Sequence, residues 1–183
     1  MKATILGNDF NRIMDATKSF CASGDRAQFG YIRLDFDAVA LRVEAYACDG
    51  YRLSVEHSVI GTCDESFTVY LRGGIRLPGK QYATIELVGD EVQIRCNGAL
   101  FGFEQPRNIQ PFEWKNVIPK GDAHFRIGFN GNYLLNALQA AKVSAGQTFK
   151  NPIVLEFWTP TTPVIIRTNT DDIKMVLPIR IKE

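Results

Sequence analysis

A switch in apolar periodicity that occurs three times along the chain constrains its fold more than any other feature. Apolar residues recur at every second position in short runs, then at helical spacing, and then at every second position again. Each repeat is therefore predicted to contain a strand, a helix and three further strands. The helices are expected near Asn8, Leu71 and Asn130, a period of about 60 residues. One such unit cannot bury its own apolar face, so neighbouring repeats must share a core.

The first two repeats differ in how strongly they predict a helix. The first opens with the strand pattern KATIL, and Asn8 is the expected cap of the helix that follows. The apolar face of this helix is predicted to contain Phe10, Ile13, Met14 and Phe20. The second repeat opens with SFTVYL, but Gly73, Gly74 and Pro78 follow at once. These residues weaken a helix, so the second helix is predicted to be short or irregular.

The third repeat opens with HFRIGF and has Asn130 as the expected helix cap. The apolar face of its helix is predicted to contain Leu134, Leu135, Leu138 and Ala141. Strands are predicted in PIVLEFW, PVIIRT and IKMVLPIRI. The fold class is therefore α+β, with three repeated strand-helix-three-strand units.

The repeats divide the chain into residues 1–119, with two units, and residues 120–183, with one. The stretch QPRNIQPFEWKNVIPKGD joins them and leaves two interpretations open. It is either a plain connector, because its prolines favour extended chain, or the floor of a groove. In the second case Phe112, Trp114 and Val117 would supply apolar wall.

Composition and charge exclude several classes of protein. The 183 residues are 45% hydrophobic and 22% charged with a net charge of +1, which is typical of an ordinary globular chain. No apolar stretch approaches the roughly 18 residues of a membrane-spanning helix, and the first residues lack a signal-peptide core. A cytoplasmic protein without membrane contact is expected. The four cysteines show no Cys-x-x-Cys spacing and no nucleophile motif surrounds the two histidines, so we expect no metal, no cofactor and no enzymatic activity.

Four motifs in one order carry a resemblance to a known family. Residues 47–55, ACDGYRLSV, resemble the Asp-Gly-His-Arg-Leu signature of the bacterial DNA polymerase III beta subunit, the sliding clamp, with Tyr51 in place of histidine. The end of the chain, MVLPIRIKE, is similar to that family's C-terminal Met-Pro-Met-Arg-Leu. FEWKNVIPK resembles its Phe-Pro-Asp-Tyr segment ending in Leu-Pro-Lys, and IGFNGNYLLNAL its Phe-Asn-x-x-Tyr-Leu helix entrance.

The resemblance implies a DNA-clamp-like fold with helices on one face and antiparallel sheets on the other. A family chain has three domains of two units each. Residues 1–119 resemble the complete middle domain, and residues 120–183 resemble only the second half of the last domain.

In the family, a pocket between the middle and last domains receives partner peptides. Carried over position by position, the resemblance places the pocket at Cys48, Gly50, Tyr51, Arg52, Leu53, Phe112, Asn116, Val117, Pro163, Met175, Leu177, Pro178, Ile179 and Arg180. Taken without the resemblance, Asp49-Gly50 is a common hairpin turn, and Pro178 could simply protect a sheet edge from pairing.

DNA contacts in the family arise from helices that meet the phosphate backbone without reading sequence. The corresponding basic residues are Arg12, Lys18, Arg72, Arg76, Lys80 and Lys142. The same charges could form an ordinary solvated helix face, which Asp15 would dilute.

Two functions remain from the sequence. In the first, an oligomer encircles double-stranded DNA as a polymerase processivity factor and docks a polymerase or other proteins with clamp-binding motifs; whether a clamp loader places it on DNA is left open. In the second, the chain is a peptide-docking module that never closes around DNA. The missing half-domain further predicts a dimer in which the helix face with Leu134, Leu138 and Ala141 packs against its own copy.

Overall fold

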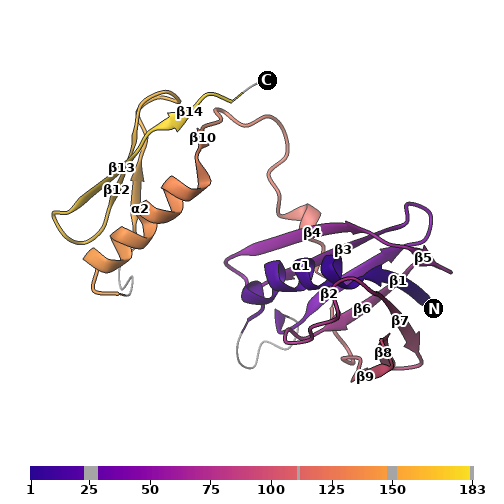
Figure 1. Ribbon diagram of the computed structural model, residues 1–183. Coiled ribbons are helices and arrows are strands. Elements are labelled where there is room, and N and C mark those ends of the chain that lie inside the picture. Colours follow the sequence, from indigo (N-terminus) through magenta and orange to yellow (C-terminus); the bar gives the residue numbers. More distant parts are fainter. Residues whose placement is uncertain (23–28, 111, 148–151, 182–183) are drawn as a thin grey trace. The chain divides into compact units, whose positions relative to one another are not determined.

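The structure is a computed structural model that describes residues 1–22, 29–110, 112–147 and 152–181. The chain forms two compact units, Met1–Ile118 (unit 1) and Pro119–Glu183 (unit 2), which are described separately. Neither described helix is long and apolar enough to cross a membrane. Figure 1 labels most of the elements of both units.

The described residues of unit 1 form two antiparallel sheets and one α-helix. Its elements are β1 (Lys2–Leu6), α1 (Gly7–Thr17), the 3-10 helix η1 (Lys18–Phe20), β2 (Ile32–Asp37), β3 (Arg42–Cys48), β4 (Leu53–Val59), β5 (Thr62–Cys63), β6 (Phe67–Leu71), β7 (Tyr82–Val88), β8 (Glu91–Cys96), β9 (Ala99–Glu104) and the 3-10 helix η3 (Trp114–Asn116). The strand order is β5-β1-β7-β8-β9 in one sheet and β4-β3-β2-β6 in the other.

The two repeats of unit 1 exchange their first strands. Strand β1 opens the first repeat but pairs with β7 of the second, with Thr4 opposite Thr84. Strand β6 opens the second repeat but pairs with β2 of the first, with Leu34 opposite Val69. Each sheet of unit 1 therefore contains strands of both repeats.

Alternating apolar residues place one face of each sheet in a common core. Leu34 of β2 and Ile85 of β7 are fully buried, as are Phe10 and Ile13 of α1, while Met14 is 2% exposed. The predicted apolar face of the first helix is thus confirmed. Phe20, which was assigned to the same face, lies in η1 and is only partly buried against the core.

Helix α1 begins without the side-chain cap that the sequence predicts. Leu6 occupies the cap position, and Asn8 lies inside the first turn. The first backbone N–H groups are satisfied by a distant segment instead, because Gly7 donates to the carbonyl of Gln81 and Asn8 to that of Gly79, both at 2.8 Å. A helix end needs such partners for its free N–H groups, and here tertiary contacts supply them.

No α-helix occurs among the described residues of the second repeat. Residues 72–81 form turns and extended chain that pack along α1, so the short or irregular helix predicted near Leu71 is wrong. Asn11 donates to the carbonyl of Leu77 at 2.8 Å and accepts its N–H at 2.9 Å, while Arg76 pairs with Asp15. These contacts with α1 replace the backbone bonds that a helix would form.

In the part of unit 2 that the structure describes, one helix lies against a three-stranded sheet. Its elements are β10 (Gly128–Phe129), α2 (Gly131–Ser144), β11 (Val154–Glu156), β12 (Val164–Arg167), β13 (Ile173–Val176) and β14 (Pro178–Ile179). The strands form the antiparallel sheet β11-β12-β13 and the separate antiparallel pair β10-β14. Asn130 caps α2 as predicted, since its Oδ1 accepts the N–H groups of Asn132 at 3.0 Å and Tyr133 at 3.3 Å.

The predicted apolar face of α2 packs within its own unit. Ala141 is fully buried with Val164 and Ile166 of the sheet, and Leu134 and Leu138 are packed against this cluster. The expectation that Leu134, Leu138 and Ala141 lack a companion is therefore wrong, because the sheet of the same repeat already covers them. The large apolar side chains that α2 exposes are Tyr133, Leu135 and Val143.

Candidate functional site

The first part of the candidate site is the β3–β4 hairpin. Cys48 pairs with Leu53, so the turn has four residues rather than the two that Asp49-Gly50 suggests. The Asp49 carboxylate closes it by accepting the N–H groups of Tyr51 at 2.9 Å and Arg52 at 2.8 Å. Gly50 has a φ of 92°, a region that favours glycine. Tyr51 is 86% exposed at the tip of the turn.

Arg52 attaches this turn to the end of the first helix. Its guanidinium forms two hydrogen bonds with Asp49, at 2.9 and 2.7 Å, and donates to the carbonyl of Ser19 at 3.0 Å. It also lies over the Phe20 ring at 5.2 Å. The backbone N–H of Tyr51, then the side chain and N–H of Arg52, lower the pKa of Asp49 to about 2. Arg52 therefore has a structural role in the turn. Its side chain nevertheless remains partly exposed.

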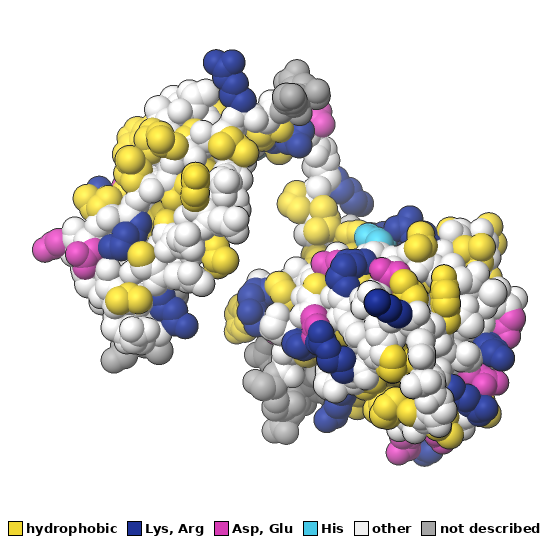
Figure 2. Space-filling view, in the orientation of Figure 1, with side chains coloured by type: hydrophobic (Ala, Val, Ile, Leu, Met, Phe, Trp, Pro, Cys, Tyr) yellow, Lys and Arg dark blue, Asp and Glu magenta, His cyan; other side chains and the backbone are white. Residues whose placement is uncertain are grey.

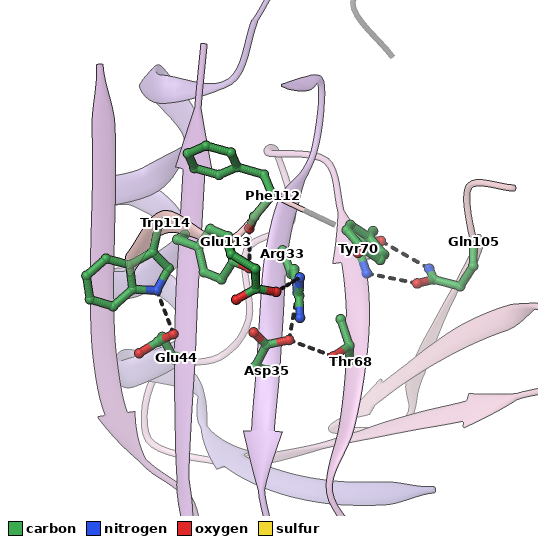
Figure 3. A network of polar contacts seen from close by, with 10 residues as sticks. Arg33, Asp35, Glu44, Thr68, Tyr70, Gln105, Phe112, Glu113 and Trp114 are labelled. Atoms are coloured by element: carbon green, nitrogen blue, oxygen red, sulfur yellow. Dashed lines mark hydrogen bonds and ion pairs between the residues drawn. The ribbon is translucent and has the colours of Figure 1, made fainter. Parts of the chain in front are cut away.

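The segment after β9 lies on the outer face of the β2–β3–β6 sheet (Figure 3). The side-chain amide of Gln105 accepts the N–H of Tyr70 at 2.8 Å and donates to the carbonyl of Tyr70 at 3.0 Å, so it satisfies both backbone groups of this residue of β6. Tyr46 donates its hydroxyl to the carbonyl of Phe112 at 2.9 Å, and Arg33 contacts Glu113 at 3.4 Å. Burial raises the pKa of Tyr46, which keeps the hydroxyl protonated as a donor. These contacts hold the segment on the sheet of unit 1, and residues 112–117 are called the anchored segment below.

Trp114 fixes the end of the anchored segment. Its indole N–H donates to Glu44 at 2.8 Å, and the other oxygen of Glu44 lies 2.9 Å from His57. Burial raises the pKa of Glu44, but the hydrogen bonds from Trp114 and His57 outweigh it and lower the pKa overall. Trp114 thus has a specific polar partner that neither sequence interpretation of the connector included.

Two predicted pocket residues of unit 1, Cys48 and Phe112, line one small cavity. The cavity has a volume of about 20 Å³, which is room for one water molecule and not for a peptide side chain. Its other lining residues are Phe29, Tyr31, Arg33, Tyr46, Ala47, Tyr70, Ile109 and Gln110. Asn116 and Val117 are exposed and do not line it. Within unit 1 the predicted residues therefore form an open surface around the turn and the anchored segment.

In unit 2, three predicted residues line a larger hollow. Pro178, Ile179 and Arg180 contribute to a space of about 710 Å³, within the range of ligand sites. Its other lining residues are Ala123, Arg126, Gly128, Pro160, Thr161 and Ile181. The sequence did not predict these lining residues. The β10–β14 pair brings together residues about 50 positions apart, and no local pattern predicts that pairing.

The other predicted residues of unit 2 lie outside the hollow. Pro163 precedes β12, Met175 lies on β13, and Leu177 lies between β13 and β14. Met175 and Leu177 are 57% and 63% exposed. They offer apolar surface without an enclosing pocket in this unit.

The predicted DNA-contacting residues are dispersed and partly neutralised. Arg12 pairs with Glu56 at 2.6 Å, and Asp15 pairs with both Lys18 at 2.6 Å and Arg76 at 2.8 Å. The pKa of Asp15 is lowered, first by its hydrogen bond with Lys18, so this carboxylate stays charged beside its two partners.

The remaining cations differ in environment. Arg72 lies over the Tyr31 ring at 4.9 Å, and like Arg76 and Lys80 it belongs to the non-helical segment rather than to a helix as expected. Lys142 lies in the last turn of α2. No ion pair involves Lys80 or Lys142 among the described residues.

Within the described parts of the chain, no group of three or more histidine, cysteine or acidic side chains could hold a metal ion. All four cysteines are free thiols. Burial raises the pKa of Cys21 and Cys63, which makes these two thiols less reactive.

The two interleaved sheets and the helix packed on them define the fold of bacterial sliding clamps. The chain superposes on a putative DNA polymerase III beta subunit from Eubacterium rectale with a TM-score of 0.83 at 11% identity, and on the sliding clamp of Bacillus subtilis with 0.82 at 15%. A Helicobacter pylori beta clamp bound to a DNA ligase peptide gives 0.72 at 11%. Each match covers 97% of this chain but only 49% to 50% of the other.

The chain thus spans about half the length of these clamps. No protein-family profile matches the sequence, and no curated protein does. The clamp-like fold that the sequence motifs implied is confirmed.

Proposed function

We propose that the chain is a sliding-clamp-like processivity factor that encircles double-stranded DNA as an oligomer and docks partner peptides. The observation that carries this proposal is the clamp fold itself, which covers 97% of the chain, in spite of identities of 11% to 15%. A clamp acts by topology and docking, so the proposed role is non-enzymatic. Its DNA contacts would be to phosphates and independent of sequence.

Peptide docking is proposed at the surfaces that the resemblance selected. In unit 1 these are the turn at Tyr51 and Arg52 and the anchored segment at Phe112. In unit 2 they are the exposed Leu177 and the hollow beside Ile179 and Arg180. Apolar side chains with a few polar groups suit a short peptide with aliphatic or aromatic anchors. The Helicobacter pylori clamp that resembles this chain was solved bound to a DNA ligase peptide, which supports peptide docking by analogy.

A second candidate function is a peptide-docking module that does not encircle DNA. The neutralised cations favour it, because Arg12, Lys18 and Arg76 all have acidic partners. An ion-paired side chain must give up its partner, or share it, before it neutralises a phosphate.

Retention on closed DNA separates the two functions. The protein is incubated with a nicked circular plasmid, with or without a clamp loader, and passed over a sizing column at 200 mM salt, before and after the plasmid is linearised. An encircling oligomer stays with the circle and is lost from the linear form. Equal loss from both forms would reject encirclement and leave the docking module.

Peptide docking is tested by matched exposed aliphatic residues of unit 2. Leu177→Asp should weaken binding of a labelled peptide with leucine and phenylalanine anchors at least tenfold in fluorescence polarisation. Val143→Asp, at a side chain 60% exposed against 63% for Leu177, should leave binding unchanged. Equal affinity of both variants would exclude the docking surface at Leu177.

A further inference from the structure

Unit 2 repeats the architecture of the first half of unit 1. The first half runs β1, α1, β2, β3, β4 and β5, and its last short strand returns to pair antiparallel with β1. Unit 2 runs β10, α2, β11, β12, β13 and β14, and its last short strand likewise pairs antiparallel with β10. The element order and the strand pairing agree, so unit 2 is one half of the domain that unit 1 shows complete.

The two helices can be aligned residue by residue from their first glycines. The core-facing positions of α1 are Gly7, Phe10, Ile13, Met14 and Thr17. The positions at the same spacing in α2 are Gly131, Leu134, Ala137, Leu138 and Ala141, of which the last four pack in the core of unit 2. The alignment makes Leu135 the counterpart of Asn11.

In unit 1, the second half covers three features of the first. Strand β6 pairs along the outer edge of β2, strand β7 pairs along the free side of β1, and the non-helical segment packs on Asn11. Consequently Leu34 of β2 and Ile5 of β1 are fully buried, and Phe67 of β6 is 7% exposed.

All three counterparts are uncovered in unit 2. The only described neighbour of β11 is β12, and the only described neighbour of β10 is β14. Leu155 of β11, on the same sheet face as its buried neighbour Ile166, is 43% exposed, and Leu135 is 53% exposed.

Among the described residues, the chain before β10 also lacks a partner strand. Residues 124–129, HFRIGF, have a strand pattern, yet only Gly128 and Phe129 are paired. Phe125 occupies the position in the apolar alternation that Phe67 occupies in β6. Phe125 is 59% exposed, whereas Phe67 is 7% exposed. Figure 2 shows hydrophobic side chains at several places on the visible surface of unit 2.

We propose that unit 2 of one chain is completed by unit 2 of a second copy through reciprocal strand exchange. Residues 125–129 of each copy add antiparallel to the free edge of β11 of the other, as β6 adds to β2 and β1 to β7 in unit 1. The two copies of Leu135 meet near the two-fold axis. The contact is isologous, so the same edge and the same strand serve both copies.

A second copy fits better than an unrelated partner because both elements that the exchange requires are present in this chain. Among the described residues of unit 2, one edge of β11 has no partner strand, and the apolar residues before β10 are unpaired. The corresponding segments are the ones that pair between the two repeats of unit 1. Free strand edges of this kind are templates for pairing with another chain. The product is a dimer with three complete domains, two from the unit 1 copies and one shared.

This inference goes beyond the proposed function and does not depend on DNA or peptide binding. Purified full-length protein is measured by light scattering from 1 to 100 μM, without DNA, for the wild type, Phe125→Asp and Ile173→Asp. Ile173 is 53% exposed but lies on β13, the strand at the opposite edge from β11. We expect a wild-type dimer, a dissociation constant raised at least tenfold in Phe125→Asp, and no change in Ile173→Asp.

Circular dichroism first establishes that both variants are folded, and hydrogen exchange gives a second readout. Amides of residues 125–127 and 154–156 should become more protected as the wild-type concentration rises. A monomeric wild type at 100 μM, or a Phe125→Asp dimer as tight as the wild type, would overturn strand exchange. A dimer that is not retained on circular DNA would support the exchange and reject only the encircling function.

Discussion

Gly7→Ala should destabilise unit 1, although alanine is the better helix former. Gly7 is the first residue of α1, and a Cβ at this position would lie 2.1 Å from the carbonyl oxygen of Pro78 and 2.9 Å from its carbon. The obstacle is backbone, so it cannot move aside as a flexible side chain would. Gly131, the first residue of α2, has no atom within 4 Å of such a Cβ and provides the matched control.

The expected loss follows from the contacts around Pro78. An ordinary contact begins at 3.4 Å, so the segment must move by more than 1 Å. Overpacking of this kind costs about 1–3 kcal/mol. A movement of that size also breaks the bonds from Gly7 to Gln81 and from Asn8 to Gly79, worth about 1 kcal/mol each. Replacing glycine in a helix returns about 0.5–1 kcal/mol, which leaves a net loss of about 2–4 kcal/mol.

Urea unfolding followed by circular dichroism measures this loss. With a slope of about 1–3 kcal/mol per molar urea, the transition of unit 1 should shift by about 1 M or more. Gly131→Ala should leave that transition unchanged. A Gly7→Ala protein as stable as the wild type would show that residues 78–81 do not pack against the start of α1 as described.

Three further predictions concern a helix cap, a turn and the anchored segment. Asn130→Ala should destabilise unit 2 by about 1 kcal/mol in thermal unfolding, and the neighbouring Asn132→Ala should have little effect, because only the first removes the side-chain cap of α2. The pKa of Asp49 is about 2 in the folded chain against 3.8 for the free side chain, so its ionised form stabilises the fold above about pH 4 and this contribution is lost as the pH falls through 2. Asp49→Asn, which loses the ion pair with Arg52, should therefore be less stable than the wild type at pH 6, and the difference should shrink towards pH 2; a constant difference would contradict the assignment. Tyr46→Phe removes the hydrogen bond to the Phe112 carbonyl, so it should destabilise the packing of the anchored segment by about 1 kcal/mol and speed tryptic cleavage at Lys115. An unchanged cleavage rate would show that the Tyr46 hydroxyl does not hold the segment.

The sequence by itself determined the clamp-like fold class, most of the elements and much of the core. Alternation at Ile32, Leu34 and Phe36 and helical spacing at Phe10 and Ile13 are local patterns, and each places one face in the core. The cap at Asn130 is equally local, because the side chain bonds to N–H groups two and three residues ahead. The family motifs were visible for the same reason, since each lies in a short continuous stretch.

Tertiary structure alone decided the features that depend on contacts between distant residues. Asn8 is not a cap, because the carbonyls of Gly79 and Gln81, more than 70 residues away, satisfy the first N–H groups of α1. The segment 72–81 is not a helix, because its bonds go to α1 instead of to its own backbone.

The candidate sites follow the same division. Composition left the connector undecided, and only hydrogen bonds to Tyr46 and Glu44 show that it is anchored to the sheet of unit 1. The apolar face of α2 is readable from sequence, but which surface covers it is not. An amphipathic pattern predicts that one helix face is buried but does not identify the surface that covers it. For α2 that surface is the sheet of unit 2. Among the described residues one edge of β11 has no partner strand, and the sequence could not show this, since strand pairing is a contact between segments that no local pattern specifies.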